Sequence, residues 1–182
     1  MLHVITGGSG SGKSAYAEEL VQKTGAGRRI YIATMIPYGE EGRQRVARHR
    51  ELRRKKQFET VECYTNLEKL ELGGHADAVL LECMSNLVAN EMFETDGAKD
   101  ETVEAVCRGV EHLLAQTGQL FLVTNEIFSD GNSYDPETAL YLERLGAVNR
   151  RLAGMADTVT EVIYGIPNRI KEQQNETMLE QP

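Results

Sequence analysis

Short apolar runs alternate along the chain with longer segments in which apolar residues recur every three or four positions. The apolar runs predict strands at residues 2–6, 29–35, 58–64, 78–84, 119–124 and 158–164. The periodic segments predict helices at residues 15–22, 40–56, 86–93, 100–116 and 136–156. Strands that alternate with amphipathic helices are typical of the α/β class, in which a mostly parallel sheet carries helices on both faces.

Capping residues indicate where several helices begin. Thr65 and Glu68 have the spacing of a capping box and predict a short additional helix. Asp100 is expected to cap the helix that ends near residue 116. Asp135, which precedes a proline, is a favourable N-cap for the next helix.

The length of 182 residues predicts a single domain that spans 1–182 and buries a sizeable core. Its last part, residues 171–182, is polar and is expected to fray. We find no internal repeat, no low-complexity segment and no apolar run near the roughly 20 residues of a membrane helix.

A glycine-rich loop follows the first predicted strand. The loop Gly7-Gly8-Ser9-Gly10-Ser11-Gly12-Lys13-Ser14 matches the phosphate-binding pattern G-x-x-x-x-G-K-[ST]. Its glycines allow backbone N–H groups to turn toward phosphate oxygens, and the following helix N-terminus adds a positive dipole end. Lys13 would reach the β- and γ-phosphates, and the Ser14 hydroxyl would ligate Mg²⁺. A nucleoside triphosphate-binding P-loop domain is therefore predicted.

Polar residues stand at the ends of several predicted strands, where open parallel sheets bind their ligands. These residues are Thr34, Glu82 and the run Thr124-Asn125-Glu126. Glu82 ends an apolar strand, the arrangement in which a second strand holds the Mg²⁺ bound by Ser14. Glu126 has a similar position and is a candidate for contact with substrate or metal. The alternative for both is a carboxylate that only faces water.

Charge and cysteine content narrow the function classes. The net charge of −8 argues against a general nucleic-acid binder. The cysteines, Cys63, Cys83 and Cys107, are too widely spaced for a zinc site and too few for a disulfide framework. They indicate a reducing, cytoplasmic setting.

One basic segment contrasts with the acidic remainder of the chain. Residues 43–56 hold eight Arg or Lys residues and one Glu, a local charge of +7. On a helix, Arg45, His49 and Arg53 would share one face. The guanidinium groups would disfavour a charged imidazole, leaving His49 neutral and nucleophilic, and could also bind triphosphate oxygens. From spacing alone, a solvated basic face is the favoured alternative.

The ordered motifs of the chain resemble the bifunctional adenosylcobinamide kinase/adenosylcobinamide-phosphate guanylyltransferase family of cobalamin biosynthesis. The resemblance covers residues 6–171. Its motifs are T-G-G-x-x-S-G-K-S at 6–14, Y-I-A-T at 31–34, R-V-x-x-H-x-x-x-R at 45–53, T-x-E at 60–62, L-L-E-C at 80–83, T-N-E at 124–126 and G-x-x-N-x-x-L-A at 146–153. The chain departs from the family at residues 127–136, where the family has a V-G-x-G-I-V-P loop.

The resemblance implies a RecA-like parallel sheet and a homotrimer. It places His49 at the family's guanylylated histidine, and it adds Glu62 and Thr34 to Arg45, Arg53, Glu82 and the phosphate loop as nucleotide-binding residues. The implied substrates are ATP, GTP and a corrinoid, with Mg²⁺ as cofactor. The implied partners include neither nucleic acid nor membrane.

The sequence therefore predicts an enzyme that phosphorylates adenosylcobinamide and then transfers GMP to adenosylcobinamide phosphate through His49, giving adenosylcobinamide-GDP. Lys13 and His49 are the predicted catalytic residues. One alternative is a plain small-molecule kinase in which His49 takes no part. A second is a RecA-like NTP-driven switch or nucleic-acid-binding protein that uses residues 43–56. No local motif indicates which base the nucleotide pocket prefers.

Overall fold

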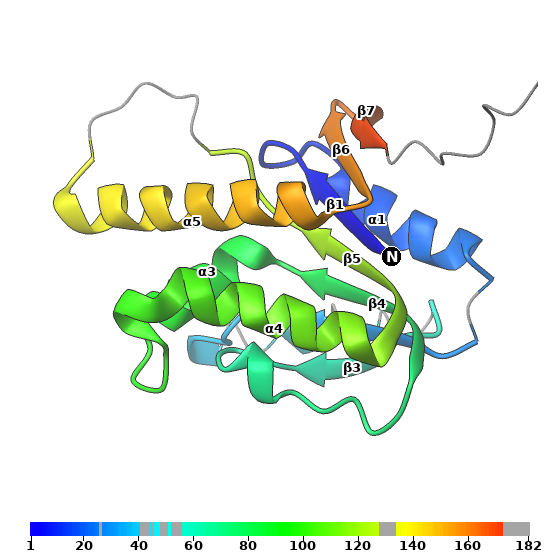
Figure 1. The fold of residues 1–182 in the computed structure, drawn as a ribbon, viewed down its shortest axis with the longest axis horizontal. Helices are drawn as coiled ribbons and strands as arrows, with labels where there is room; N and C mark the ends of the chain where they lie inside the picture. Colours follow the sequence, from blue (N-terminus) through cyan, green and yellow to red (C-terminus); the bar gives the residue numbers. More distant parts are fainter. Residues whose placement is uncertain are drawn as a thin grey trace, which may run out of the picture.

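The protein forms a seven-stranded sheet with the strand order β3-β2-β4-β5-β1-β6-β7 (Figure 1). This computed structural model describes residues 1–25, 27–40, 44, 46–47, 51, 56–127 and 134–172. The strands are β1 (Leu2–Thr6), β2 (Arg29–Ala33), β3 (Glu59–Glu62), β4 (Ala76–Glu82), β5 (Thr117–Val123), β6 (Thr158–Ile163) and β7 (Ile166–Glu172). Strands β1 to β6 pair in parallel, and β7 is antiparallel to β6. The predicted α/β class is confirmed.

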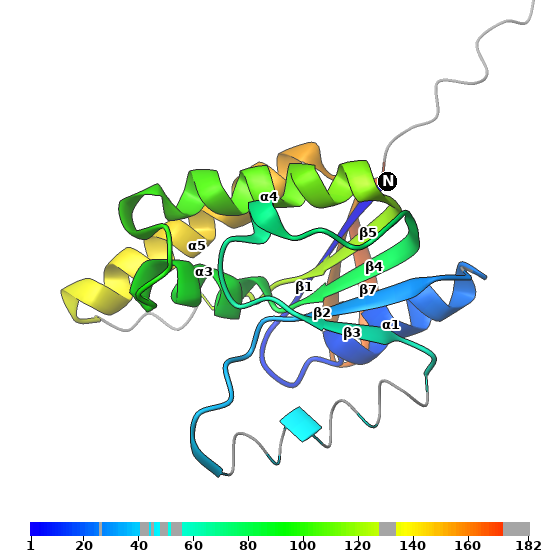
Figure 2. The same cartoon turned by 90° about the horizontal axis from the view of Figure 1, so that it is seen from below.

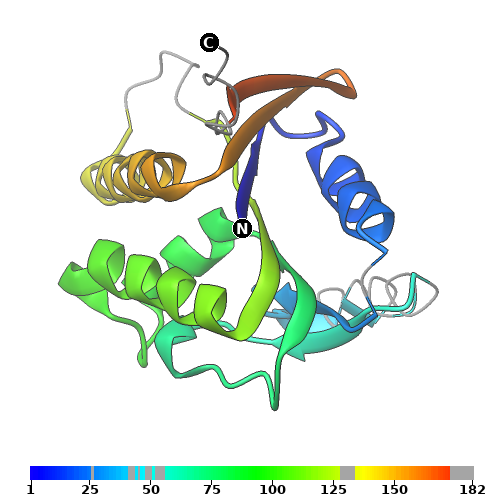
Figure 3. The same cartoon turned by 45° about the vertical axis from the view of Figure 1, so that its right-hand side comes forward.

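Helices cover both faces of the sheet (Figures 2 and 3). Their bounds are α1 (Lys13–Lys23), α3 (Met84–Phe93), α4 (Thr102–Gln116) and α5 (Pro136–Met155), with short 3-10 turns η1 (Leu67–Lys69) and η2 (Lys99–Glu101). Helix α1 lies on one face, and α3, α4 and α5 lie on the other. Among the described residues, no helix combines the length and apolarity needed to cross a membrane.

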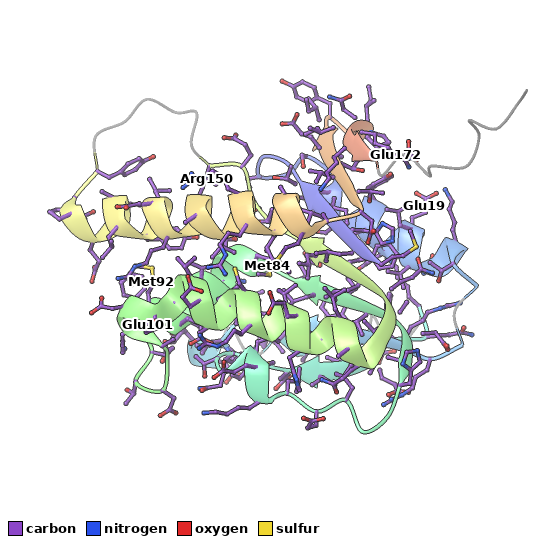
Figure 4. The ribbon with its side chains drawn as sticks, in the orientation of Figure 1. Glu19, Met84, Met92, Glu101, Arg150 and Glu172 are labelled. Carbon is purple, nitrogen blue, oxygen red and sulfur yellow. The ribbon has the colours of Figure 1, made fainter. Side chains whose placement is uncertain are left out.

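The core has two parts, one on each face of the sheet. Successive side chains of β4 alternate between them: Val79 and Leu81 pack toward α3 and α4, whereas Ala78 and Leu80 pack toward α1. Burial on both faces explains why the central strands are continuous apolar runs. Met84 and Met92 of α3 fill the layer between the helices on the larger side (Figure 4).

All six predicted strands form, with ends that lie within two residues of the predicted ones. The Asp135 cap is also confirmed, since its carboxylate accepts hydrogen bonds from the backbone N–H groups of Glu137 and Thr138, both at 3.0 Å. The predicted helix at 40–56 falls largely outside the described residues.

Two predicted caps are wrong. The Thr65 capping box does not form, because Asn66 occupies the N-cap of η1 in a left-handed conformation and its N–H donates to the buried carboxylate of Glu91. Asp100 does not cap α4, because it lies within η2 and its carboxylate pairs with Arg144 at 2.8 Å. In both cases an interaction with a residue distant in sequence, Glu91 or Arg144, replaces the local capping hydrogen bond that the sequence predicts.

Strand β7 was not predicted, and it includes Lys171 and Glu172 of the segment expected to fray. Most of its side chains are exposed, so it lacks the apolar run that marks a buried strand. Its pairing with β6 orders it, and Lys171 also donates to the carbonyls of Ala153 and Gly154 at the end of α5.

Candidate functional site

The phosphate loop joins the carboxyl end of β1 to the start of α1, at the centre of the sheet. A Cβ atom at Gly7 would lie 2.5 Å from the carbonyl oxygen of Val162, so only glycine fits there. Gly12 precedes α1 with φ of 91°, a left-handed conformation that favours glycine. Behind the loop, the N–H of Gly165 in the β6–β7 turn donates to the Ser11 carbonyl at 2.8 Å. The loop shape is therefore held by β6 and its turn as well as by its own glycines.

Lys13 points back over the phosphate loop. Its Nζ donates to the Gly8 carbonyl at 3.0 Å, and the residue is only 8% exposed. Burial lowers the pKa of the Lys13 ammonium, while the nearby Cys83 and Glu82 act in the opposite direction. The Lys13 ammonium is thus held beside the backbone of the phosphate loop, whose N–H groups can turn toward a bound anion.

Ser14 and Glu82 meet although 68 residues separate them. The Ser14 hydroxyl donates to Oε1 of Glu82 at 2.5 Å, and the Tyr31 hydroxyl donates to the other carboxylate oxygen. In the part of the chain that the structure describes, no three His, Cys, Asp or Glu side chains cluster in a way that could hold a metal ion. One hydroxyl and one carboxylate fit Mg²⁺, which takes few protein oxygens and completes its shell with phosphates and water.

A pocket of about 450 Å³ opens beside Glu82 and is called the Glu82 pocket below. Its lining includes Tyr31, Met35, Val46, Glu62, Glu82 and Asn86. Glu62, a predicted nucleotide-binding residue, accepts a hydrogen bond from the Tyr64 hydroxyl at 3.0 Å. Val46 stands three positions before His49 in the sequence. His49, Arg45 and Arg53 themselves lie outside the described residues, so their predicted roles remain predictions.

Thr34 supports the strand end and does not line the Glu82 pocket. Its side chain is fully buried. Its hydroxyl donates to the Cys83 carbonyl at 2.9 Å and accepts from the Cys83 N–H at 2.8 Å. This geometry makes Thr34 a support for the backbone that follows Glu82. Its predicted contact with the nucleotide stays a prediction.

A second, larger hollow lies between the phosphate loop and α5 and is called the α5 groove. Its volume is about 980 Å³, and its lining includes Ser9, Glu126, Ile127, Tyr134, Tyr141 and Leu142. Glu126 is brought here because its N–H donates to the Gly7 carbonyl at 3.1 Å. Of the divergent segment 127–136, residues 128–133 lie outside the described ranges.

Polar side chains join the two hollows at the ends of β4 and β5. The Asn125 amide donates to the Ser85 hydroxyl at 2.5 Å, and that hydroxyl lies 2.8 Å from the Cys83 thiol. The Tyr141 hydroxyl donates to the Ser85 carbonyl at 3.3 Å, and burial raises the pKa of Tyr141. The carboxyl ends of β4 and β5 are therefore linked directly to α5.

Several residues of the site carried no functional prediction. Tyr31 could not be linked to Glu82 without the pairing of β2 with β4. Asn149 of α5 reaches the end of β5, where its amide oxygen accepts from the Thr124 hydroxyl at 2.7 Å. Asn149 does stand in one of the motifs that carry the family resemblance, which is the one sequence signal that could have indicated it. Asn125 belongs to the run Thr124-Asn125-Glu126, which the sequence already placed at a strand end.

Comparison with known proteins gives a consistent result. The family model described as cobinamide kinase/cobinamide phosphate guanyltransferase matches residues 3–170. The chain is 34% identical to the bifunctional adenosylcobalamin biosynthesis protein CobU of Salmonella typhimurium and 33% identical to CobU of Escherichia coli, covering 94% of this chain and 100% of each relative. It is 29% identical to CobP of Pseudomonas aeruginosa, covering 94% of this chain and 98% of that protein.

A solved structure supports the fold alone. The flagellar accessory protein FlaH from Methanocaldococcus jannaschii superposes with a TM-score of 0.50 over 94% of this chain and 78% of that chain, at 13% identity. Together with the strand order, this similarity confirms the RecA-like P-loop fold predicted for this chain.

Proposed function

Because the chain belongs to the cobinamide kinase/cobinamide phosphate guanyltransferase family, we propose that it phosphorylates adenosylcobinamide with ATP or GTP and then transfers GMP from GTP to the product through a guanylylated His49. The family membership makes it an enzyme of cobalamin biosynthesis with kinase and guanylyltransferase activities. The corrinoid substrate, the histidine intermediate and the use of Mg²⁺ are the parts that we add for this chain.

The position of Glu82 carries the proposal. One of its carboxylate oxygens accepts from Ser14 of the phosphate loop, and the same residue lines the pocket that holds Val46 and Glu62. Glu82 is therefore common to the proposed triphosphate site and to the pocket lined by Val46, which lies three positions before His49 in the sequence. This arrangement supports two reactions of one bound nucleotide, at its terminal and at its α-phosphate.

In the kinase reaction, the acceptor hydroxyl attacks the γ-phosphorus in line with the leaving nucleoside diphosphate. Lys13 neutralises charge on the β- and γ-phosphate oxygens, and the backbone N–H groups of the loop bind the remaining oxygens. Ser14 and Glu82 would hold Mg²⁺, which supplies further charge neutralisation on the phosphates when it is bound. Catalysis here consists of positioning and electrostatic stabilisation.

In the transferase reaction, a neutral His49 attacks the α-phosphorus of GTP. A nitrogen–phosphorus bond forms, the bond to the bridging oxygen breaks, and pyrophosphate leaves. The phosphate of the corrinoid then attacks the same phosphorus, and the imidazole departs after it takes up a proton. Arg45 and Arg53 are proposed to bind the triphosphate oxygens, since guanidinium groups match phosphate geometry.

Incubation of the protein with GTP labelled at the α-phosphate tests the proposal most directly. We expect label that is acid-labile and alkali-stable, as a phosphoramidate is, and that moves to adenosylcobinamide phosphate when this acceptor is added. A parallel assay with adenosylcobinamide and ATP should give the phosphorylated corrinoid. Protein that acquires no label and phosphorylates no corrinoid would contradict the proposal.

Glu82→Gln is expected to weaken both activities in a way that added Mg²⁺ partly restores. A neutral amide keeps an acceptor oxygen for Ser14 or Tyr31 but loses the negative charge that attracts the metal. The Mg²⁺ concentration for half-maximal activity should rise by at least about 10-fold, the effect seen even for groups that hold metal ligands indirectly. Titration of both activities with Mg²⁺ measures this shift. Glu111→Gln, at an exposed position on α4, is the matched control, and an unchanged Mg²⁺ dependence in Glu82→Gln would reduce Glu82 to a structural residue.

The assembly and location complete the proposal. We propose a homotrimer, and the β6–β7 hairpin supports a subunit contact because its apolar side chains Ile163, Tyr164, Ile166 and Ile170 are exposed, Tyr164 by 94%. Sedimentation equilibrium gives the number of subunits. A cytoplasmic location is supported by Cys63, Cys83 and Cys107, which are all free thiols.

A further inference from the structure

We propose that the α5 groove binds the hydroxyl-bearing acceptor of the kinase reaction and that Glu126 is the general base that takes the proton from this hydroxyl. The proposal rests on the proposed function, since it assigns a place and a catalytic group to one half of it. The acceptor class is a large amphipathic molecule whose apolar body carries an alcohol.

The groove opens where the terminal phosphate would lie. Lys13, the side chain that reaches the β- and γ-phosphates in this loop type, has its Nζ 3.0 Å from the Gly8 carbonyl. Ser9 directly follows Gly8 and lines the groove. A molecule in the groove therefore lies against the part of the loop that is next to the Lys13 ammonium, and its hydroxyl can approach the γ-phosphorus.

Glu126 is attached to the same part of the loop through the backbone. Its N–H donates to the Gly7 carbonyl at 3.1 Å, and its side chain lines the groove together with Ser9. Strand β5, which ends three residues before Glu126, pairs with β1 immediately before the phosphate loop. The Glu126 carboxylate therefore lies just beyond a strand end and beside the phosphate loop, a position from which a general base can act.

The remaining walls suit an amphipathic molecule. Ile127, Tyr141 and Leu142 supply apolar surface, and Tyr134 adds an aromatic ring with a hydroxyl. Tyr141 is held in place by its hydrogen bond to the Ser85 carbonyl. Asn149 holds α5 against β5 by accepting from Thr124 and donating to the Asn125 carbonyl at 3.4 Å. These hydrogen bonds fix the α5 side of the groove.

Size separates the two hollows. The α5 groove has about 980 Å³, against about 450 Å³ for the Glu82 pocket. The larger hollow is lined by Glu126, and the smaller one lies beside the Ser14–Glu82 pair. We therefore assign the bulky acceptor to the groove and leave the Glu82 pocket to the nucleotide.

The acceptor oxygen forms a bond to the γ-phosphorus while its proton passes to the Glu126 carboxylate. The bond between the γ-phosphorus and the β,γ-bridging oxygen breaks, and the electron pair leaves with the nucleoside diphosphate. The Glu126 proton is afterwards released to solvent.

Glu126→Gln tests the catalytic part. The variant should lower kcat for cobinamide phosphorylation by about 100-fold or more, the scale of general-base catalysis, with little change in KM for cobinamide. Labelling of the enzyme by GTP should match wild type, because that reaction does not use the acceptor hydroxyl. The control is Glu111→Gln, which makes the same change at an exposed position on α4.

Leu142→Ala tests the binding part. It removes apolar wall and should raise KM for cobinamide by about 10-fold or more while leaving KM for the nucleotide unchanged. Phosphorylation by Glu126→Gln within about threefold of wild type, or restoration of its activity by added Mg²⁺, would overturn the base assignment. An unchanged cobinamide KM in Leu142→Ala would overturn the groove assignment. Wild-type protein that GTP labels but that never phosphorylates cobinamide would overturn this inference alone, whereas protein that does neither would overturn the proposed function.

Discussion

His49→Ala is expected to acquire no GMP from GTP and to transfer none to adenosylcobinamide phosphate, while it still phosphorylates adenosylcobinamide. The kinase reaction needs Lys13, the loop backbone and an acceptor hydroxyl. It does not need the imidazole of His49. The transferase reaction needs a nucleophile that forms a covalent bond to the α-phosphorus. Mass spectrometry of protein incubated with GTP measures the adduct, and corrinoid product analysis measures both transfers.

Two further variants test whether the result depends on the imidazole of His49. His49→Asn should behave like His49→Ala, because the amide resembles imidazole in shape but cannot act as the nucleophile. His75→Ala, at an exposed histidine before β4, should behave like wild type. GMP found on another residue, or full GMP transfer by His49→Ala, would refute the role of His49 and favour the alternative of a plain kinase.

Lys13→Ala is expected to lower both activities together, which distinguishes it from His49→Ala. Its Nζ is the loop side-chain cation held over the Gly8 carbonyl, in the position to meet the β- and γ-phosphates. Removal of one preorganised group that stabilises transition-state charge costs about 100- to 1000-fold in rate. We therefore expect phosphorylation and enzyme labelling each to fall by at least about 100-fold, measured under saturating nucleotide.

The variant should remain folded. The lost hydrogen bond to Gly8 is worth about 0.5–1.5 kcal/mol, and the substitution also removes a cation whose pKa is lowered by burial. Lys23→Ala, at the exposed end of the same helix, removes a lysine that pairs with Glu19 on the surface and is the matched control. Near-normal turnover by folded Lys13→Ala, checked by circular dichroism and thermal unfolding, would place the triphosphate elsewhere.

Sequence reasoning predicted the fold well where burial is continuous along the chain. Strand β4 is apolar at nearly every position because both of its faces are covered, and such a run can be recognised without knowing its neighbours. Strand β7 has no such run, since its side chains are mostly exposed and its order depends on β6. The wrong caps at Thr65 and Asp100 have a similar origin, because Glu91 and Arg144 replace the local hydrogen bonds.

In the candidate site, too, some residues could be identified from the sequence, whereas their contacts could not. Lys13 and Ser14 could be identified because the phosphate loop is a local structure whose backbone geometry requires glycine at set positions. Glu82 and Glu126 could be suggested because both follow apolar strands. Their different surroundings could not be predicted, since Glu82 meets Ser14 and Tyr31, whereas Glu126 lies across the loop beside Ser9.

By itself, the sequence determined the class of the fold, the phosphate loop and, through its ordered motifs, the family. Each of these depends on residues that are close together in the chain or in a set order along it. Only the tertiary structure decided which strand ends adjoin, that the Thr34 hydroxyl binds the Cys83 backbone, and that α5 forms one wall of a groove at the loop. Those relations depend on the strand order β4-β5-β1 and on hydrogen bonds such as that between Thr124 and Asn149, which join residues far apart in sequence. Local propensities and side-chain periodicity contain no information about such contacts.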